Sequence, residues 1–231
     1  MRTPILFVPG LNCTADLFAP QIASLSPAFE CRVADHTSGA AISDIATSIL
    51  AEAPDHFALC GLSLGGYIAL DIMRQAPERV ERLALLDTQA SPESDAARER
   101  RLPLIALAQA GRFNEVPQAV WPFSVHPSRY GDAALRAATV RMAAETGAHT
   151  WLRHVQAVMS RPDARPLLPA IEVPTLVLVG AEDQITPPER AREMVAALPN
   201  GRLVVVPQCG HLSTLERPDE VNAALRQWMK Q

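Results

Sequence analysis

The sequence lacks the cysteine pattern of a metal site or a disulfide framework. Its four cysteines are Cys13, Cys31, Cys60 and Cys209. They include no CxxC pair and no Cys/His cluster at metal-ligand spacing. We therefore expect no bound metal and four free, mostly buried thiols in a protein from a reducing compartment.

Long apolar runs are also absent. The first run, at residues 5–8, spans four residues before Pro9, which is too short for the apolar region of a signal peptide. No later run is long enough to span a bilayer. These features predict a cytoplasmic protein without a membrane partner.

Lysine is almost missing, and the charge is low. Of 21 basic residues only Lys230 is lysine, which a genome rich in arginine codons would explain. The net charge of −4, with 48% hydrophobic and 20% charged residues, is typical of a soluble globular protein. It argues against a nucleic-acid partner.

Short apolar runs recur along the chain and predict about six strands. They are "ILFV" (5–8), "CRVAD" (31–35), "FALC" (57–60), "LALLD" (83–87), "TLVLVG" (175–180) and "LVVVP" (203–207). The last three are continuous rather than alternating, which is typical of parallel strands buried on both faces. Arg32 interrupts the second run, which makes it the weakest of the six.

Segments with helical spacing lie between most of these runs. One helical face carries Ile42, Ile45 and Ile49, and a second carries Val221, Leu225 and Trp228 near the end of the chain. Strands that alternate with helices predict right-handed crossovers and a mostly parallel, doubly wound α/β sheet.

The alternation breaks between about residues 91 and 170. This segment contains eight prolines and helical stripes such as Trp151, Val155 and Val158, but no strand-like run. We expect residues 1–90 and 171–231 to form the α/β core. Residues 91–170 are then a helical cap inserted before the penultimate strand.

The stretch "FALCGLSLGGYIAL" (57–70) places one serine between two glycines at the joint of two buried elements. A strand ending at Cys60, a turn "GLSLG" and a helix beginning near Gly65 are typical of a nucleophile elbow. Side chains at positions 61 and 65 would collide with neighbouring backbone, so the turn requires glycine there. Ser63 is therefore the predicted nucleophile.

A serine nucleophile needs a base, and the base needs an acid that orients it. Of the six histidines only His211 follows a late strand through a small turn, in "VVVPQCGHLSTLERP". Asp183 follows the fifth strand, in "LVLVGAEDQITP", and is the predicted acid. The adjacent Glu182 and, above all, Asp87 at the end of the fourth strand remain alternatives.

Several motifs together resemble the α/β-hydrolase superfamily, especially its small esterases and enol-lactonases. They are "GLSLGG", "VGAEDQITP", "CGHLSTLERP" and the N-terminal "ILFVPGLNCTADLF". The resemblance covers nearly the whole chain and implies the α/β-hydrolase fold. It also implies the order Ser63, Asp183, His211 for a catalytic triad, with no metal and no organic cofactor.

The resemblance further implies an oxyanion hole made by two backbone N–H groups. By motif these belong to Leu64, after the nucleophile, and to Leu11, in the loop after the first strand. The family often has His-Gly where this chain has Pro9-Gly10. A backbone donor does not depend on that side chain.

Large apolar residues of the insertion are candidates for the substrate pocket: Trp121, Phe123, Met142 and Trp151. Some of them must instead form the insertion's own core. The insertion is also rich in arginine, and an arginine that reached inward would select a substrate with a carboxylate.

The predicted activity is hydrolysis of a small, mostly apolar carboxylic ester through an acyl-enzyme intermediate. A lactonase (enol-lactone hydrolase), a C–C bond hydrolase or a cofactor-free perhydrolase would use the same triad. A ligand-binding receptor on the same fold is the alternative from outside the enzymes. The predicted partner is a small-molecule ester or lactone.

Overall fold

Six strands form one sheet in which every neighbouring pair is parallel. The structure, a computed structural model, describes residues 3–231. The strands are β1 (Ile5–Val8), β2 (Cys31–Val33), β3 (Phe57–Leu62), β4 (Val80–Leu86), β5 (Thr175–Gly180) and β6 (Gly201–Val206). Their order in the sheet is β2-β1-β3-β4-β5-β6. The predicted doubly wound α/β fold is confirmed.

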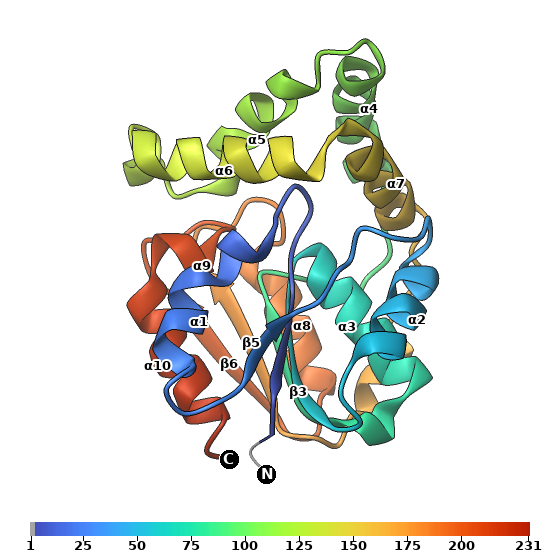
Figure 1. The fold of residues 1–231 in the computed structure, drawn as a ribbon, viewed down its shortest axis with the longest axis vertical. Helices are drawn as coiled ribbons and strands as arrows, with labels where there is room; N and C mark the ends of the chain where they lie inside the picture. Colours follow the sequence, from blue (N-terminus) through green and yellow to red (C-terminus); the bar gives the residue numbers. More distant parts are fainter. Residues whose placement is uncertain (1–2) are drawn as a thin grey trace.

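Helices cover both faces of this sheet (Figure 1). One face carries α1 (Ala19–Leu25), α9 (Ser213–Glu216) and α10 (Pro218–Trp228); the other carries α2 (Ile42–Glu52), α3 (Leu64–Gln75) and α8 (Pro188–Ala197). The apolar stripes predicted for α2 and α10 face these two cores, where Ile45, Leu225 and Trp228 are buried. Burial of these stripes, rather than intrinsic propensity, is what stabilises the helices.

Four of the six strands differ from the prediction at one or both ends, and two of these differences lie at the site. β3 continues to Leu62, and α3 begins at Leu64, so the turn between them consists of Ser63 alone. β4 ends at Leu86 because Asp87 has a positive φ of 44°, which a strand does not accommodate.

The last strand is less buried than its apolar run predicts. β6 lies at the edge of the sheet, and among its residues only Val206 is fully buried, while Val205 is 38% exposed. An edge strand has one paired side and one open side, so a continuous apolar run here does not mean burial on both faces.

Four helices lie between β4 and β5, inside the segment predicted as a cap. They are α4 (Asp95–Gln109), α5 (Val116–Ser124), α6 (Ala133–Thr146) and α7 (Ala148–Met159). Figure 1 shows them across the edge of the sheet opposite the two chain termini. A small core of their own contains Val116, Trp151 and Val155.

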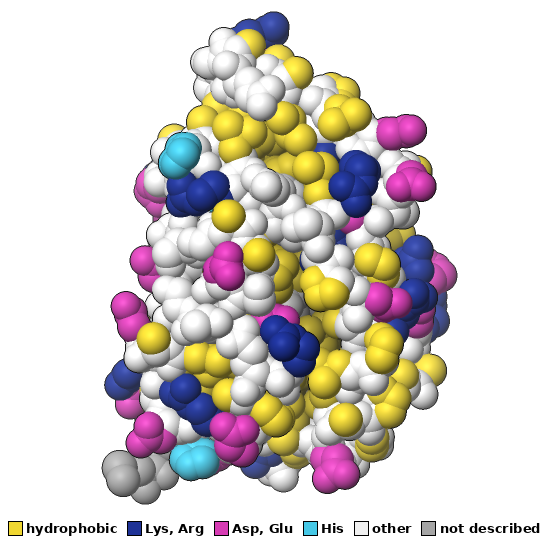
Figure 2. All heavy atoms as spheres, turned by 90° about the vertical axis from the view of Figure 1, so that its right-hand side faces the viewer, with side chains coloured by type: hydrophobic (Ala, Val, Ile, Leu, Met, Phe, Trp, Pro, Cys, Tyr) yellow, Lys and Arg dark blue, Asp and Glu magenta, His cyan; other side chains and the backbone are white. Residues whose placement is uncertain are grey.

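Because all six strands are parallel, their carboxyl ends meet at the edge that these helices cover. Figure 2 shows hydrophobic side chains gathered at the top of the molecule, where the cap helices lie, with Lys or Arg side chains beside them. Within residues 3–231, no helix is both long and apolar enough to cross a membrane.

Candidate active site

Ser63 occupies a strained turn between β3 and α3. Its backbone has φ 55° and ψ −114°, a conformation that residues with side chains rarely adopt. A Cβ on Gly61 would lie 2.2 Å from the Gly65 carbonyl oxygen, and one on Gly65 would lie 1.9 Å from the Val8 carbonyl oxygen. Only glycine at both positions allows the turn to close this tightly.

The neighbouring strand holds the turn in place. The Ser63 N–H donates to the Leu86 carbonyl at 3.0 Å, and the Thr88 hydroxyl donates to the Ser63 carbonyl at 2.8 Å. The side chain of Ser63 is thereby the only part of the residue left free for chemistry.

His211 and Asp183 form a hydrogen-bonded pair at the ends of β6 and β5. The His211 Nδ1 lies 2.8 Å from Asp183 Oδ2, and both residues are buried. The N–H groups of Ile185 and Thr186 donate to Asp183 Oδ1 at 2.8 and 3.0 Å, and the Thr186 hydroxyl donates to Oδ2 at 2.7 Å. The carboxylate is therefore fixed in one orientation by three donors before it meets the ring.

The carboxylate sets the charge preference of the ring. Burial alone would lower the pKa of His211, but the charge and hydrogen bond of Asp183 raise it above its ordinary value of 6.5. The Asp183 bond also requires a proton on Nδ1 in the neutral ring. This leaves Nε2 as the acceptor.

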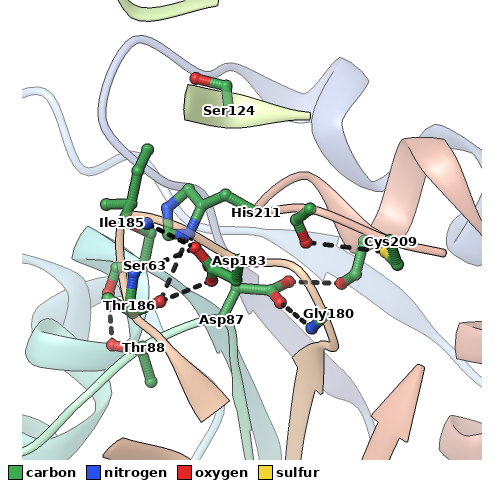
Figure 3. A network of polar contacts seen from close by, with 12 residues as sticks. Ser63, Asp87, Thr88, Ser124, Gly180, Asp183, Ile185, Thr186, Cys209 and His211 are labelled. Carbon is green, nitrogen blue, oxygen red and sulfur yellow. Dashed lines mark hydrogen bonds and ion pairs between the residues drawn. The ribbon is translucent and has the colours of Figure 1, made fainter. Parts of the chain in front are cut away.

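Ser63 and His211 line one pocket of about 120 Å³, which we name the nucleophile pocket. Figure 3 shows both residues gathered with Asp183 at the strand ends. The His211 ring makes its hydrogen bonds within residues 3–231 to Asp183 and Thr186, and the Ser63 hydroxyl makes none there. In free enzymes the bond between base and nucleophile often closes only when substrate is bound.

A second carboxyl group, that of Asp87, lies beneath this pair. Its Oδ1 accepts the Gly180 N–H at 2.9 Å, and its Oδ2 accepts the Ser213 hydroxyl. Burial, together with the charge of Asp183, raises the pKa of Asp87 to about 8. This shift favours the protonated form of Asp87, and the group braces the ends of β4 and β5 without a hydrogen bond to His211.

The two N–H groups predicted for an oxyanion hole both border the nucleophile pocket. Leu64 is the first residue of α3, a position where the N–H has no partner within its helix. The Gly10 carbonyl accepts the Cys13 N–H at 3.2 Å and lies 3.4 Å from His36 Nε2. Carbonyl and N–H point in opposite directions across a trans peptide, so these contacts turn the Leu11 N–H away from His36.

His36 was not predicted from the sequence, and neither was its partner His154 in α7. The rings stack with centroids 5.0 Å apart, and His154 Nε2 donates to the His36 carbonyl at 2.8 Å. Burial and the neighbouring His154 lower the pKa of His36 to about 4, so the ring stays neutral above that pH. This stack ties the cap to the loop that carries Leu11.

Glu216 is a further residue that the motifs did not reveal. Its buried carboxylate accepts the Gly210 N–H at 2.9 Å and the His126 N–H at 2.7 Å. The N–H groups of His211 and Leu212 both donate to the Ser124 carbonyl, at 3.1 and 3.2 Å. The loop that carries His211 is thus joined directly to the end of α5.

The four apolar residues proposed for the pocket lie in three places. Trp151 lines the nucleophile pocket. Trp121 and Met142 line a smaller cavity of about 60 Å³ beside it. Phe123 is 54% exposed and borders a larger pocket of about 330 Å³, the outer pocket, which adjoins the nucleophile pocket.

The topology and the turn at Ser63 define the α/β-hydrolase fold. The chain belongs to the alpha/beta hydrolase family, because the family model matches residues 5–224.

Relatives of known structure or assignment agree with this membership. An esterase from Thermogutta terrifontis, solved with malate bound, has a TM-score of 0.89 and 28% identity over 99% of this chain and 89% of its own. The pimeloyl-[acyl-carrier protein] methyl ester esterase of Nitrosomonas europaea is 29% identical over 77% of this chain and 73% of its own length.

Another relative is named for a different activity. The "Putative non-heme bromoperoxidase BpoC" of Mycobacterium tuberculosis is 30% identical over 71% of this chain. The chain spans 64% of the length of that relative. The family therefore includes more than one assigned chemistry close to this sequence.

Proposed function

We propose that the protein is a serine esterase that hydrolyses a small carboxylic ester through an acyl-enzyme intermediate. One observation carries the proposal: Ser63, in a strained glycine-flanked turn, shares a pocket with a histidine that is hydrogen-bonded to a buried carboxylate. The esterase relatives from Thermogutta terrifontis and Nitrosomonas europaea support the choice of an ester. The four free cysteines suit the cytoplasm as its location.

In the proposed mechanism, His211 Nε2 takes the Ser63 proton as the hydroxyl oxygen bonds to the ester carbonyl carbon. The carbonyl π-electrons move onto oxygen, where the N–H groups of Leu11 and Leu64 stabilise the negative charge. The intermediate collapses, the bond to the alcohol oxygen breaks, and His211 donates its proton to that oxygen. Asp183 stabilises the imidazolium that exists between these two transfers.

Deacylation repeats the same steps with water. His211 takes a proton from water, the hydroxide oxygen bonds to the acyl carbon, and the bond to Ser63 breaks as the proton returns to the serine oxygen. These steps need no metal and no organic cofactor.

Short p-nitrophenyl esters test the proposal directly. We expect steady turnover, an initial burst of one p-nitrophenol per active site where deacylation is slow, and an added acyl mass on the peptide that contains Ser63. Mass spectrometry of the quenched protein locates the adduct. Ligand affinity without a burst, an adduct or turnover would instead support a receptor.

The pH dependence of kcat/KM follows from the state of His211. Only the neutral ring accepts the serine proton, and the pKa of His211 is raised, so activity is lost as pH falls through a midpoint above 6.5. Below that midpoint kcat/KM falls about tenfold per pH unit. Initial rates between pH 4.5 and 9 measure the midpoint, and a flat profile down to pH 5 would contradict His211 as the base.

A further inference from the structure

Three charged residues beside the nucleophile pocket carry more positive than negative charge. The Glu93 side chain, 2% exposed, pairs with Arg161, which is 3% exposed, and also with Arg101 at 2.7 Å. Burial alone would raise the pKa of Glu93, but the two guanidinium groups hold it below its ordinary value, so the carboxyl group is ionised. Two cations share one anion, and the cluster has a net charge of +1.

Arg161 is the buried partner of this cluster, and its place is determined by several contacts. Its guanidinium group donates to the carbonyls of Ser91 at 3.1 Å and Val158 at 2.8 Å, and it lies 4.2 Å from the centre of the Tyr67 ring. It is therefore held against Glu93 and compensates that charge permanently. Arg101 is left as the uncompensated cation.

Arg101 also has unused donors. It binds Glu93 through Nε, and its two terminal nitrogens have no hydrogen-bond partner within residues 3–231. Its side chain is 21% exposed, and the residue lines both the nucleophile pocket and the outer pocket. A guanidinium group with its two terminal nitrogens free presents the paired donors that a carboxylate accepts.

The outer pocket combines charged and apolar residues around Arg101. The exposed Arg100 adds a second positive charge at the outer pocket, while Leu104, Val120 and Ile185 supply apolar surface in that pocket. A ligand with an apolar chain and an anionic end fits this pocket, because its apolar part can pack on Leu104, Val120 and Ile185 while its anionic end binds Arg101.

We propose that the substrate of this site is an ester or lactone that also carries a free carboxylate, and that Arg101 binds this carboxylate. This inference rests on the proposed esterase function and assigns its substrate class. A half-ester of a dicarboxylic acid has the required chemistry: Ser63 attacks the ester carbonyl while the free carboxylate lies on Arg101. Arg161 already neutralises Glu93. If Arg101 served only as a second partner of Glu93, the enzyme would show no preference for substrates with a carboxylate.

The test compares esters that differ only in charge. Monomethyl succinate, glutarate and adipate carry the carboxylate on the acyl side, and their terminal carboxamide analogues are the uncharged partners. Acetyl esters of short hydroxy acids carry it on the alcohol side. The measured quantity is the ratio of kcat/KM for each acid to that of its amide, which cancels any general change in activity.

For the wild-type protein we expect a ratio of about 10 to 100 in one of these two series, the magnitude of hydrogen bonds to a charged group. In Arg101→Gln the ratio falls to about one. Arg98→Gln, which removes an exposed charge from the same helix outside both pockets, keeps the wild-type ratio. A wild-type ratio near one, or an unchanged ratio in Arg101→Gln, overturns the inference.

Two outcomes separate the inference from the function on which it rests. If no ester, charged or uncharged, is hydrolysed, the esterase function itself fails. If both kinds are hydrolysed equally, only the carboxylate site fails. Should Arg101→Gln not fold because Glu93 loses a partner, Arg101→Lys decides: it keeps the ion pair but not the fork, and a ratio that falls less than about threefold contradicts the inference.

Discussion

Ser63→Ala is expected to lower kcat for ester hydrolysis by at least about 10⁴-fold. The variant keeps the backbone turn, whose geometry depends on Gly61 and Gly65, and removes only the oxygen that bonds to substrate. The residual rate comes from water attacking an ester that the pocket still binds and whose oxyanion is still stabilised. Single-turnover and steady-state assays with the same p-nitrophenyl ester measure the loss.

The matched control is Ser38→Ala. The Ser38 hydroxyl lies in an exposed loop, and its hydrogen bond within residues 3–231 is to the Ser48 hydroxyl. This control variant should retain wild-type kcat. Both variants should have the same circular dichroism spectrum and the same melting temperature as the wild-type protein, within a few degrees. Turnover by Ser63→Ala within about tenfold of wild type would refute the nucleophile assignment.

Asp183→Asn is expected to lower kcat by about 10⁴-fold, whereas Asp87→Asn should stay within about tenfold of wild type. At position 183 the N–H groups of Ile185 and Thr186 both point at Oδ1. They fix the amide so that its NH₂ faces His211 Nδ1. The ring then carries its proton on Nε2 and is no longer a base toward Ser63.

The same substitution at Asp87 replaces a buried group whose raised pKa favours its uncharged form. The amide oxygen accepts the Gly180 N–H, and the NH₂ group donates to the Ser213 oxygen, so both contacts survive. The two variants therefore make the same oxygen-to-nitrogen exchange at neighbouring strand ends, but only Asp183→Asn changes a group that contacts His211. If Asp87→Asn proves the more damaging one, Asp87 replaces Asp183 as the acid in the mechanism.

The fold was predictable from sequence because parallel strands covered by helices leave a direct signature. The continuous runs at β4 and β5 can be buried only in a sheet covered on both faces, and neither of these strands lies at an edge. The run at β6 has the same composition, yet it forms an edge strand. Apolar composition shows that a strand can be buried. Whether the strand lies inside the sheet or at its edge depends on how many other strands pair with it.

The candidate site was predictable where its chemistry requires a local pattern. The glycines around Ser63 are dictated by backbone atoms closer than 2.5 Å to any added Cβ, so the motif appears in the sequence itself. His36 and Glu216 act on backbone groups instead, at Gly10 and Gly210. A side chain that binds a backbone group of another residue needs no particular sequence there, and it becomes visible only once the chain is folded.

Arg101 illustrates the same limit for specificity. The insertion offers many arginines, and sequence alone does not separate one that borders the nucleophile pocket from those on a solvated helix face. What distinguishes Arg101 is that its acidic partner, Glu93, is already compensated by Arg161 from 68 residues away in the chain. This sharing of one carboxylate by two arginines exists only in the folded protein and cannot be read from any one stretch of sequence.

The N–H groups of His211 and Leu212 both donate to the Ser124 carbonyl, and these bonds restrict the route by which substrate enters and product leaves. Lifting the end of α5 off the sheet would either break both bonds or move His211, the proposed general base, with it. Entry and exit that leave His211 undisturbed would therefore use another opening, and the outer pocket, which is bordered by α4 and α5 and adjoins the nucleophile pocket, offers one. The end of α5 is therefore expected to stay in place during turnover, while substrate and product pass through the outer pocket.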